Sequence, residues 1–281
     1  MTIVNSAQRE NWNGEGGQAW VADADRRDIA LAGIADSLLS TAAPRPGETV
    51  LDVGCGCGAT SLAVARDVGP GGAVHGLDIS DVMLAVARQR ATAAGLSNLT
   101  FTQADVQTHQ FAPATHDLAV SRFGTMFFED ALAAFTNVAG ALRPGGRLCI
   151  ATWQPLAVND WLSIPGAVLE RYGTLPDMGS GPGMFAQSDP SAVTTLLRSA
   201  GFSDIDIEPI VVLMTLGETP EIAADYVASS GIGRAVLGTI SPDRQASALD
   251  ALRQVMADHD GPNGVALNGS VLITTAFVRG D

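Results

Sequence analysis

The chain has 281 residues, of which 46% are hydrophobic and 16% are charged, so it can fill the core of one large domain and is not a disordered sequence. Its formal net charge of −14 argues against nucleic acid and anionic lipid as partners, because both repel an acidic surface. All 16 basic residues are arginines, which excludes Schiff-base and pyridoxal-phosphate chemistry and a Walker-type phosphate loop, since each depends on a lysine.

The three cysteines, Cys55, Cys57 and Cys149, are an odd number without the spacing of a disulfide framework. Such usage indicates a reducing compartment. The N-terminal residues contain no apolar segment of signal-peptide length, and no apolar run approaches the ~18 residues of a membrane span. We therefore expect a soluble cytoplasmic protein without a membrane partner.

The first half of the chain alternates apolar β-branched runs with alanine-rich segments of helical spacing. A polar leader that contains Trp12 and Trp20 comes first, and a helix is predicted over about residues 27–41. Strands are then predicted at 49–53, 73–77, 99–102, 118–120 and 147–152, with helices at 60–68, 82–94 and 131–142. This alternation predicts βαβ units and a doubly wound parallel sheet, that is, a Rossmann-like α/β fold.

The second half follows a different pattern. Segments 205–216 and 271–278 are expected to be two long antiparallel strands, and helices are expected at 220–230 and 242–259 between them. We therefore predict a seven-stranded sheet with helical lid insertions after strands five and six. The expected division is a cofactor-covering segment at 1–47, a cofactor-binding core at 48–153, and lid insertions with the last two strands at 154–281.

A glycine-rich loop follows the first predicted strand. Asp52 lies near the end of that strand, and Gly54, Gly56 and Gly58 alternate with small residues before a helix begins. Glycine lets the backbone turn sharply and approach a ligand closely, and the helix N-terminus offers free N–H groups. Asp78 ends the second strand, where its carboxylate can accept the hydroxyls of a ribose.

This pattern also satisfies the fingerprint of NAD(P)-dependent oxidoreductases. Two carboxylates favour S-adenosylmethionine instead. Asp52 would repel a dinucleotide pyrophosphate but attract a cationic amine, and Asp105 follows the third strand, where it can accept a hydrogen bond from an adenine amino group. An oxidoreductase remains the alternative.

The stretch from Val50 to Trp153 resembles the class I S-adenosylmethionine-dependent methyltransferases, closest to the ubiquinone/menaquinone-type and natural-product small-molecule enzymes. The resemblance rests on the segments VLDVGCGCG (50–58), GLDIS (76–80), ADV (104–106), HDLAVSRFG (116–124) and LRPGGRL (142–148), which occur in the family's order. It covers about half of the chain. His116 departs from the family pattern, in which that position is usually aromatic.

The resemblance implies a cofactor site. Asp52 would meet the methionine amine, Asp78 would hold the ribose, and Asp105 and Val106 would contact the adenine edge. The other implied cofactor residues are Trp20 in the leader, Gly54, Cys55 and Gly56 in the loop, Ile79 and Met83 beside the adenine, and Ser121 and Phe123 after strand four.

Candidates for the acceptor side are weaker. Arg122, Phe127, Trp153 and Trp161 are candidate substrate-binding residues, and His109, His259 and Tyr172 are candidate catalytic residues. No metal site is expected, because Cys55 and Cys57 have no second ligand pair at a suitable spacing.

The implied activity is methyl transfer to a small, hydrophobic or aromatic molecule, with S-adenosylhomocysteine as the second product. A sulfonium already carries a good leaving group, so the protein needs mainly to align the reactants and exclude water. The sequence leaves open C-, O- or N-methylation, a monomer or a homodimer, and S-adenosylmethionine binding with non-methylating chemistry.

Overall fold

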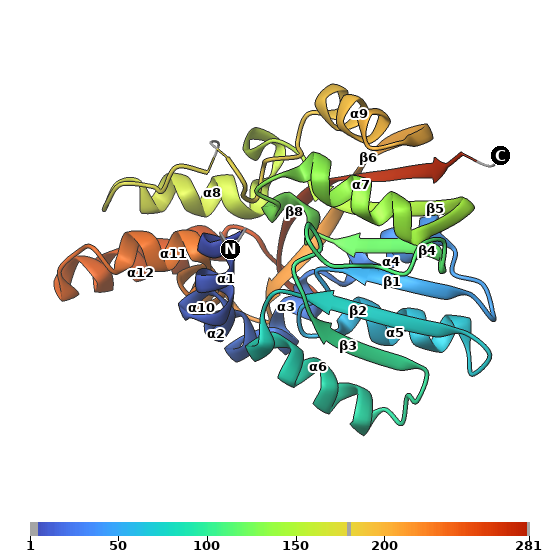
Figure 1. Ribbon diagram of the computed structural model, residues 1–281. Coiled ribbons are helices and arrows are strands. Elements are labelled where there is room, and N and C mark those ends of the chain that lie inside the picture. Colours follow the sequence, from blue (N-terminus) through green and yellow to red (C-terminus); the bar gives the residue numbers. More distant parts are fainter. Residues whose placement is uncertain (1–4, 179–180, 280–281) are drawn as a thin grey trace.

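In the computed structural model, which describes residues 5–178 and 181–279, one mixed sheet has the strand order β3-β2-β1-β4-β5-β8-β6 (Figure 1). Strands β1 to β5 run parallel, β8 is antiparallel to β5, and β6 is antiparallel to β8. Their bounds are Thr49–Val53, Ala73–Asp78, Leu99–Gln103, His116–Arg122, Leu142–Trp153, Phe202–Gly217 (β6) and Gly264–Val278 (β8). The predicted seven strands are confirmed, and a two-residue strand β7, Asp260–Gly261, is added as an eighth beside β8.

Helices cover both faces of this sheet. The helices α4 (Ala32–Ala42), α5 (Ala59–Val68) and α6 (Asp81–Ala93) lie on one face, and α7 (Ala131–Ala141) and α9 (Pro190–Ser199) lie on the other (Figure 1). Strand β1 alternates between them: Val50 packs into the cluster beneath α4 and α5, and Leu51 and Val53 pack into the cluster beneath α7 and α9. This two-sided burial explains why the central strands read as continuous apolar runs.

Most predicted boundaries agree with the structure, because local signals set them. Ser80 caps α6 by accepting a hydrogen bond from the Met83 N–H, and Asp130 caps α7 in the same way. The helix predicted over 27–41 is instead two helices, α3 (Ala24–Ala30) and α4, which are separated at Leu31. Helices α1 (Ser6–Asn13), α2 (Glu15–Ala22), α8 (Asp160–Leu169), α9 and α11 (Gly231–Leu237) were not predicted by residue range.

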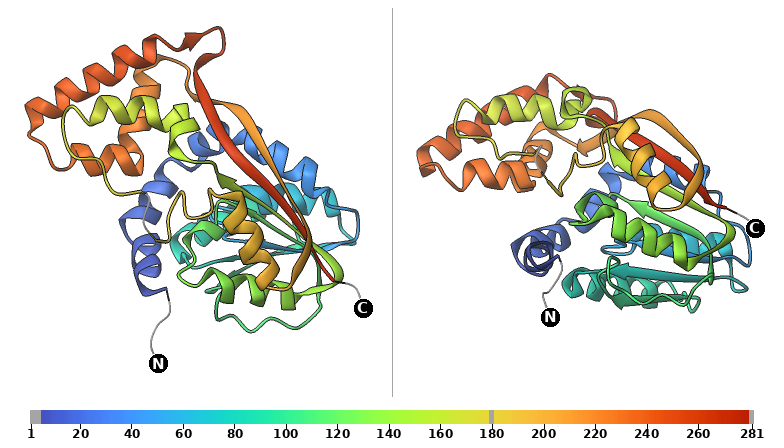
Figure 2. Two further views of the ribbon diagram at one scale, coloured as in Figure 1. Left: turned by 90° about the horizontal axis from the view of Figure 1, so that it is seen from above. Right: turned by 45° about the horizontal axis from the view of Figure 1, so that its top comes forward.

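The leader and the insertions gather beyond the carboxyl ends of the parallel strands (Figures 1 and 2). The leader forms α1 (Ser6–Asn13) and α2 (Glu15–Ala22), and the insertions form α8 (Asp160–Leu169), α10 (Pro220–Ser229), α11 and α12 (Pro242–Ala257). Residues 1–4 of the leader, 179–180 of the first insertion and 280–281 lie outside the described residues. Within the described ranges, no helix has the length and apolar character needed to cross a membrane.

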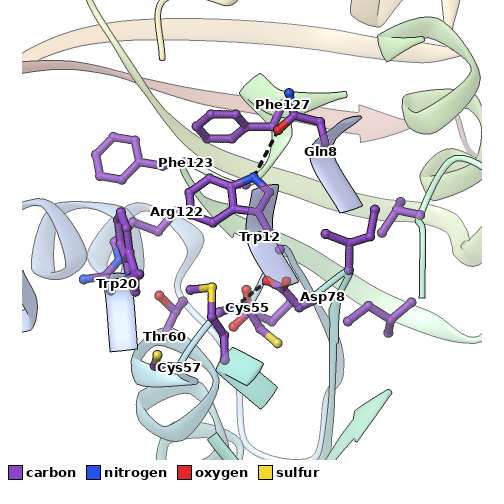
Figure 3. Close-up of a pocket in the computed structure, with 18 of the residues that line it drawn as sticks. Gln8, Trp12, Trp20, Cys55, Cys57, Thr60, Asp78, Arg122, Phe123 and Phe127 are labelled. Atoms are coloured by element: carbon purple, nitrogen blue, oxygen red, sulfur yellow. Dashed lines mark hydrogen bonds between the residues drawn. The ribbon is translucent and has the colours of Figure 1, made fainter. Parts of the chain in front are cut away.

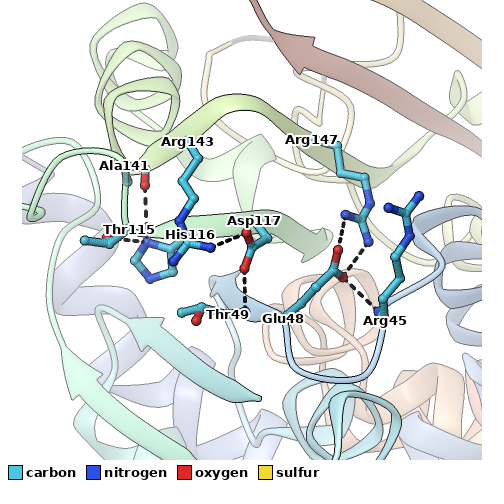
Figure 4. Close-up of polar contacts among 9 residues, drawn as sticks. All are labelled: Arg45, Glu48, Thr49, Thr115, His116, Asp117, Ala141, Arg143 and Arg147. Carbon is cyan, nitrogen blue, oxygen red and sulfur yellow. Dashed lines mark hydrogen bonds and ion pairs between the residues drawn. The ribbon is translucent and has the colours of Figure 1, made fainter. Parts of the chain in front are cut away.

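Polar contacts tie together the opposite, amino-terminal edge of the sheet (Figure 4). Arg147 donates two hydrogen bonds to Glu48, at 2.6 and 2.7 Å, and Asp117 accepts the Thr49 N–H at 2.8 Å. His116 is buried at this edge, where its Nε2 lies 2.9 Å from Nδ1 of His75. The unusual histidine of the fourth motif therefore packs at a strand end, far along β4 from the edge at which the cofactor is expected.

Candidate functional site

A pocket of roughly 1000 Å³, including its open mouth, lies where β1, β2, β3 and β4 end. Its base is the glycine-rich loop, in which Gly54, Gly56 and Gly58 all adopt left-handed backbone angles. A Cβ on Gly54 would lie 2.7 Å from Cα of Gly124, and a Cβ on Gly56 would lie 2.9 Å from Cε of Met83. The left-handed backbone thus favours glycine at all three positions, and at Gly54 the backbone of Gly124 also leaves no room for a Cβ.

Asp52 places a carboxyl group in the wall of this pocket with only 1% of its surface exposed. One oxygen, Oδ2, accepts a hydrogen bond from the Ser61 hydroxyl at 2.5 Å, whereas Oδ1 has no partner among the described residues. Burial raises the pKa of the Asp52 carboxyl to about 6. A buried carboxylate oxygen without a donor is costly to maintain, and a cationic ligand would relieve this cost.

Asp78 holds the glycine loop from the end of β2. Its two oxygens accept the N–H groups of Gly56 and Ser80, both at 2.8 Å. Burial raises the pKa of Asp78, although these two hydrogen bonds oppose the shift. Ile79 and Met83 continue the same wall of the pocket.

At the end of β3, Asp105 and Val106 form a third part of the wall. The Asn5 side chain, which comes from the leader, donates to both oxygens of Asp105 at 3.0 and 3.1 Å and to Gln107 at 2.9 Å. Asn5 is 4% exposed and has a left-handed backbone. The leader is therefore anchored directly at this end of the pocket.

Three aromatic side chains cover the pocket from the leader and from the turn after β4 (Figure 3). The ring of Trp12 lies edge-on to Trp20 at 6.0 Å and to Phe127 at 5.2 Å between centroids. The Ser80 hydroxyl donates to the Trp12 carbonyl at 2.5 Å, and Gln8 accepts the Trp12 indole N–H at 3.1 Å. These contacts fix the leader over the glycine loop.

Arg122 and Phe123 continue the pocket at the end of β4. Arg122 pairs with Asp28 at 3.0 Å, and the second oxygen of Asp28 pairs with Arg90 at 2.9 Å. Phe123 has a φ of 70°, a left-handed conformation that a bulky side chain seldom adopts. Its ring stacks on Trp153 at 4.4 Å, so the strained residue is held by packing.

A model of methyltransferase domains matches residues 50–146, from the glycine loop to the turn within β5. The nocamycin O-methyltransferase of Saccharothrix syringae is 28% identical over 88% of this chain and 91% of its own length. A demethylmenaquinone methyltransferase of Bacillus cytotoxicus is 28% identical over 63% of this chain and 80% of its own length. The chain is an S-adenosylmethionine-dependent methyltransferase.

The fold of this methyltransferase agrees with that of solved enzymes. Phosphoethanolamine N-methyltransferase 2 of Haemonchus contortus, solved with S-adenosylhomocysteine, superposes with a TM-score of 0.58 at 18% identity. The superposition covers 98% of this chain and 59% of the other. At this identity the likeness concerns the fold alone.

The structure brings most of the predicted cofactor residues of the methyltransferase together. Eleven of the twelve line the pocket: Trp20, Asp52, Gly54, Cys55, Gly56, Asp78, Ile79, Met83, Asp105, Val106 and Phe123. Ser121 is not among the lining residues, because its buried hydroxyl faces β1 and donates a hydrogen bond to the Val53 carbonyl at 2.7 Å. Ser121 therefore holds the β1 and β4 ends together instead of facing the pocket.

Two of the four predicted substrate-binding residues line the pocket, and two do not. Arg122 and Phe127 line the pocket, whereas Trp153 and Trp161 are buried behind Phe123, with their rings 5.0 Å apart. None of the three candidate catalytic residues lines it. His109 packs edge-on to Phe111, His259 lies in the turn between α12 and β7, and Tyr172 packs against the core after α8.

The lining residues absent from the predicted set include four from the N-terminal helices and the residue before them: Asn5, Gln8, Trp12 and Asp28. Only Trp12 had a signal in the sequence, as a tryptophan in a polar leader. The others belong to α1 and α3 or precede α1, and only the docking of the leader brings them to the pocket.

Cys57 also lines the pocket, and burial raises the pKa of its thiol to about 11, so it is a thiol and not a thiolate ligand.

Proposed function

We propose that the pocket binds S-adenosylmethionine with its amino group against Asp52, its ribose against Asp78 and its adenine between Ile79, Asp105 and Val106. The unpartnered Oδ1 of Asp52 carries this proposal, because it needs a buried donor and an ammonium group supplies one. Gly54 and Gly56 line the pocket, so the loop backbone faces a ligand without an intervening side chain. When bound, the cofactor would supply a methyl group from its sulfonium sulfur, and this sulfur becomes the thioether sulfur of S-adenosylhomocysteine.

The proposed acceptor is a small molecule with a hydrophobic or aromatic surface. The aromatic side chains of Trp12, Trp20, Phe123 and Phe127, which line the pocket, support this choice, as do the molecules named in the two relatives, nocamycin and demethylmenaquinone. A net charge of −14 disfavours nucleic acid as the acceptor. Three buried free cysteines fit a reducing compartment, and we propose that the reaction takes place in the cytoplasm.

In this proposal the chain acts by alignment and exclusion of water. The leader helices close the cofactor side, residues 48–153 form the cofactor-binding core, and the insertion helices close the acceptor side. None of the three candidate bases, His109, His259 and Tyr172, lines the pocket. In this proposal the acceptor therefore carries a nucleophile that reacts without help from these side chains as a general base.

Isothermal titration of the full chain with S-adenosylhomocysteine, beside NAD and NADP, tests the proposal. We expect micromolar binding of S-adenosylhomocysteine and no binding of the two dinucleotides, since Asp52 repels a pyrophosphate. Binding of a nicotinamide nucleotide alone would refute the proposed site. Transfer of a labelled methyl group to an acceptor distinguishes turnover from mere retention of the cofactor.

A further inference from the structure

Arg27 on α3 is a buried cation whose side chain lacks a full set of partners. It is 9% exposed, and its Nε has no hydrogen-bond partner among the described residues. The carboxylate paired with it, Asp23, is 3.9 Å away, beyond hydrogen-bond distance. Desolvation lowers the pKa of the Arg27 guanidinium, but arginine remains charged in proteins. The fold therefore carries an incompletely neutralised buried charge, which is costly unless something binds it.

The surroundings of Arg27 connect the cofactor pocket to the lid. Its guanidinium carbon lies 4.7 Å from the ring centre of Trp20, which lines the pocket, and 5.9 Å from that of Tyr226 on the lid helix α10. Tyr226 is 3% exposed. Burial raises the pKa of the Tyr226 phenol, and the charges of Arg27 and Arg122 oppose this shift, so both guanidinium groups act on the same phenol.

Several charged side chains lie at this junction. Arg234 on α11 is a further cation near Arg27. Of the neighbouring carboxylates, Asp28 is already shared between Arg122 and Arg90. Arg27, Arg122 and Arg234 thus lie near one junction with the lid, and Asp23 and Asp28 are the carboxylates paired with the first two.

We propose that Arg27 and Tyr226, which lie behind Trp20 and outside the set of pocket-lining residues, determine acceptor specificity by binding an acidic oxygen, of the carboxylate type, on an aromatic acceptor whose ring packs near Trp20. This inference rests on the proposed function and names its substrate class. A guanidinium presents paired N–H donors that match a carboxylate, and a phenol adds one more donor. The cation–π contacts with Trp20 and Tyr226 hold the guanidinium in place before the acceptor arrives.

Salicylate and its uncharged analogue salicylamide are suitable probes, because they differ only in the carboxylate. Each is titrated into the full chain saturated with S-adenosylhomocysteine. The wild-type protein should bind salicylate about tenfold or more tightly than salicylamide, as expected for one desolvated charge-assisted contact. Equal affinities, or no binding of salicylate, would overturn the inference.

The variants separate recognition from folding. Arg27→Gln should abolish the preference for salicylate, Arg27→Lys should keep part of it, and Tyr226→Phe should reduce it several-fold. Arg253→Gln removes the same charge from an exposed pair on α12 and should leave the preference unchanged. A purely structural role for Arg27 would alter the stability of the variants but not the ratio of the two affinities.

Binding of S-adenosylhomocysteine to the wild-type chain separates the two proposals. If S-adenosylhomocysteine fails to bind, the proposed function fails. If it binds and the preference for salicylate persists in Arg27→Gln, only the role of Arg27 is refuted.

Discussion

Replacing Asp52 by asparagine should leave the unliganded methyltransferase as stable as the wild type or more stable, while weakening its affinity for S-adenosylhomocysteine. The fold raises the pKa of this carboxyl from 3.8 to about 6. Because one pKa unit corresponds to about 1.4 kcal/mol, the ionised side chain destabilises the folded state at neutral pH by about 3 kcal/mol. Asparagine removes this cost.

The gain is partly offset. The asparagine oxygen can still accept the Ser61 hydroxyl, but its amide nitrogen would stand where Oδ1 lacks a partner. A buried donor without an acceptor costs about 1–3 kcal/mol. The net expectation for Asp52→Asn at neutral pH is a change in the free energy of unfolding between about 0 and +2 kcal/mol.

The pH dependence follows from the sign of the shift. Since the folded pKa of Asp52 lies above the unfolded value of 3.8, its contribution to stability is complete below about pH 4 and is lost as the pH rises through 6. Asp52→Asn lacks this loss, so its advantage over the wild type should grow between about pH 4 and 6 and stay constant above 7.

Ligand affinity should change in the opposite direction. Loss of a charge-assisted hydrogen bond of about 1.5–3 kcal/mol weakens binding of S-adenosylhomocysteine by about 10- to 150-fold. Wild-type affinity should also fall below pH 6, as Asp52 becomes protonated, and Asp52→Asn should not show this fall.

Urea unfolding and isothermal titration between pH 5 and 8 measure both quantities. Asp117→Asn, at the opposite edge of the sheet, is the matched control and should leave the affinity unchanged. Destabilisation of unliganded Asp52→Asn by more than about 1 kcal/mol, or an unchanged dissociation constant, would refute the assignment of Asp52.

Further changes test the remaining parts of the site. Asp78→Ala should weaken binding of S-adenosylhomocysteine at least about tenfold in calorimetry, and unchanged affinity would contradict the ribose assignment. A Cβ on Gly17 would lie 1.9 Å from a backbone oxygen of α1, so Gly17→Ala should undock the leader and weaken cofactor affinity, whereas exposed Gly140→Ala should not. Burial lowers the pKa values of His75 and His116 below 6.5; because the unfolded chain then binds more protons, their contribution is complete above pH 6.5 and is lost as the pH falls. His116→Phe should therefore flatten the loss of stability from about pH 6.5 to 5, and an unaltered slope in urea titrations would exclude this origin.

The parallel half of the fold could be predicted because its signals are local. Each of β1 to β4 is a short segment rich in apolar and β-branched residues, with a polar residue at its last or second-to-last position, and glycine or a capping residue follows β1 and β2. The carboxyl ends of parallel strands share one edge, so Asp52, Asp78 and Asp105 could be assigned to one site from the sequence.

The lid was harder to predict because its periodicity is interrupted. Helix α8 contains Pro165 within its span, and η2 (Leu156–Val158) and a long irregular segment lie on either side of it. Because a proline lacks the backbone N–H that a helix interior needs, Pro165 argues against a continuous helix in this segment. The burial of α8 depends on packing against α12 and β8, which begin only at Pro242 and Gly264.

Ser121, Phe123 and Trp153 illustrate why strand-end position alone does not identify a pocket residue. All three lie at or just beyond the carboxyl ends of β4 and β5, yet only Phe123 lines the pocket. Alternation along β4 turns Ser121 toward the Val53 carbonyl. The left-handed turn at Phe123 then brings its ring between the pocket and Trp153. Phenylalanine disfavours a positive φ, so the residue type at position 123 gives no signal for this conformation. Packing imposes it, and it could not be deduced from the local sequence.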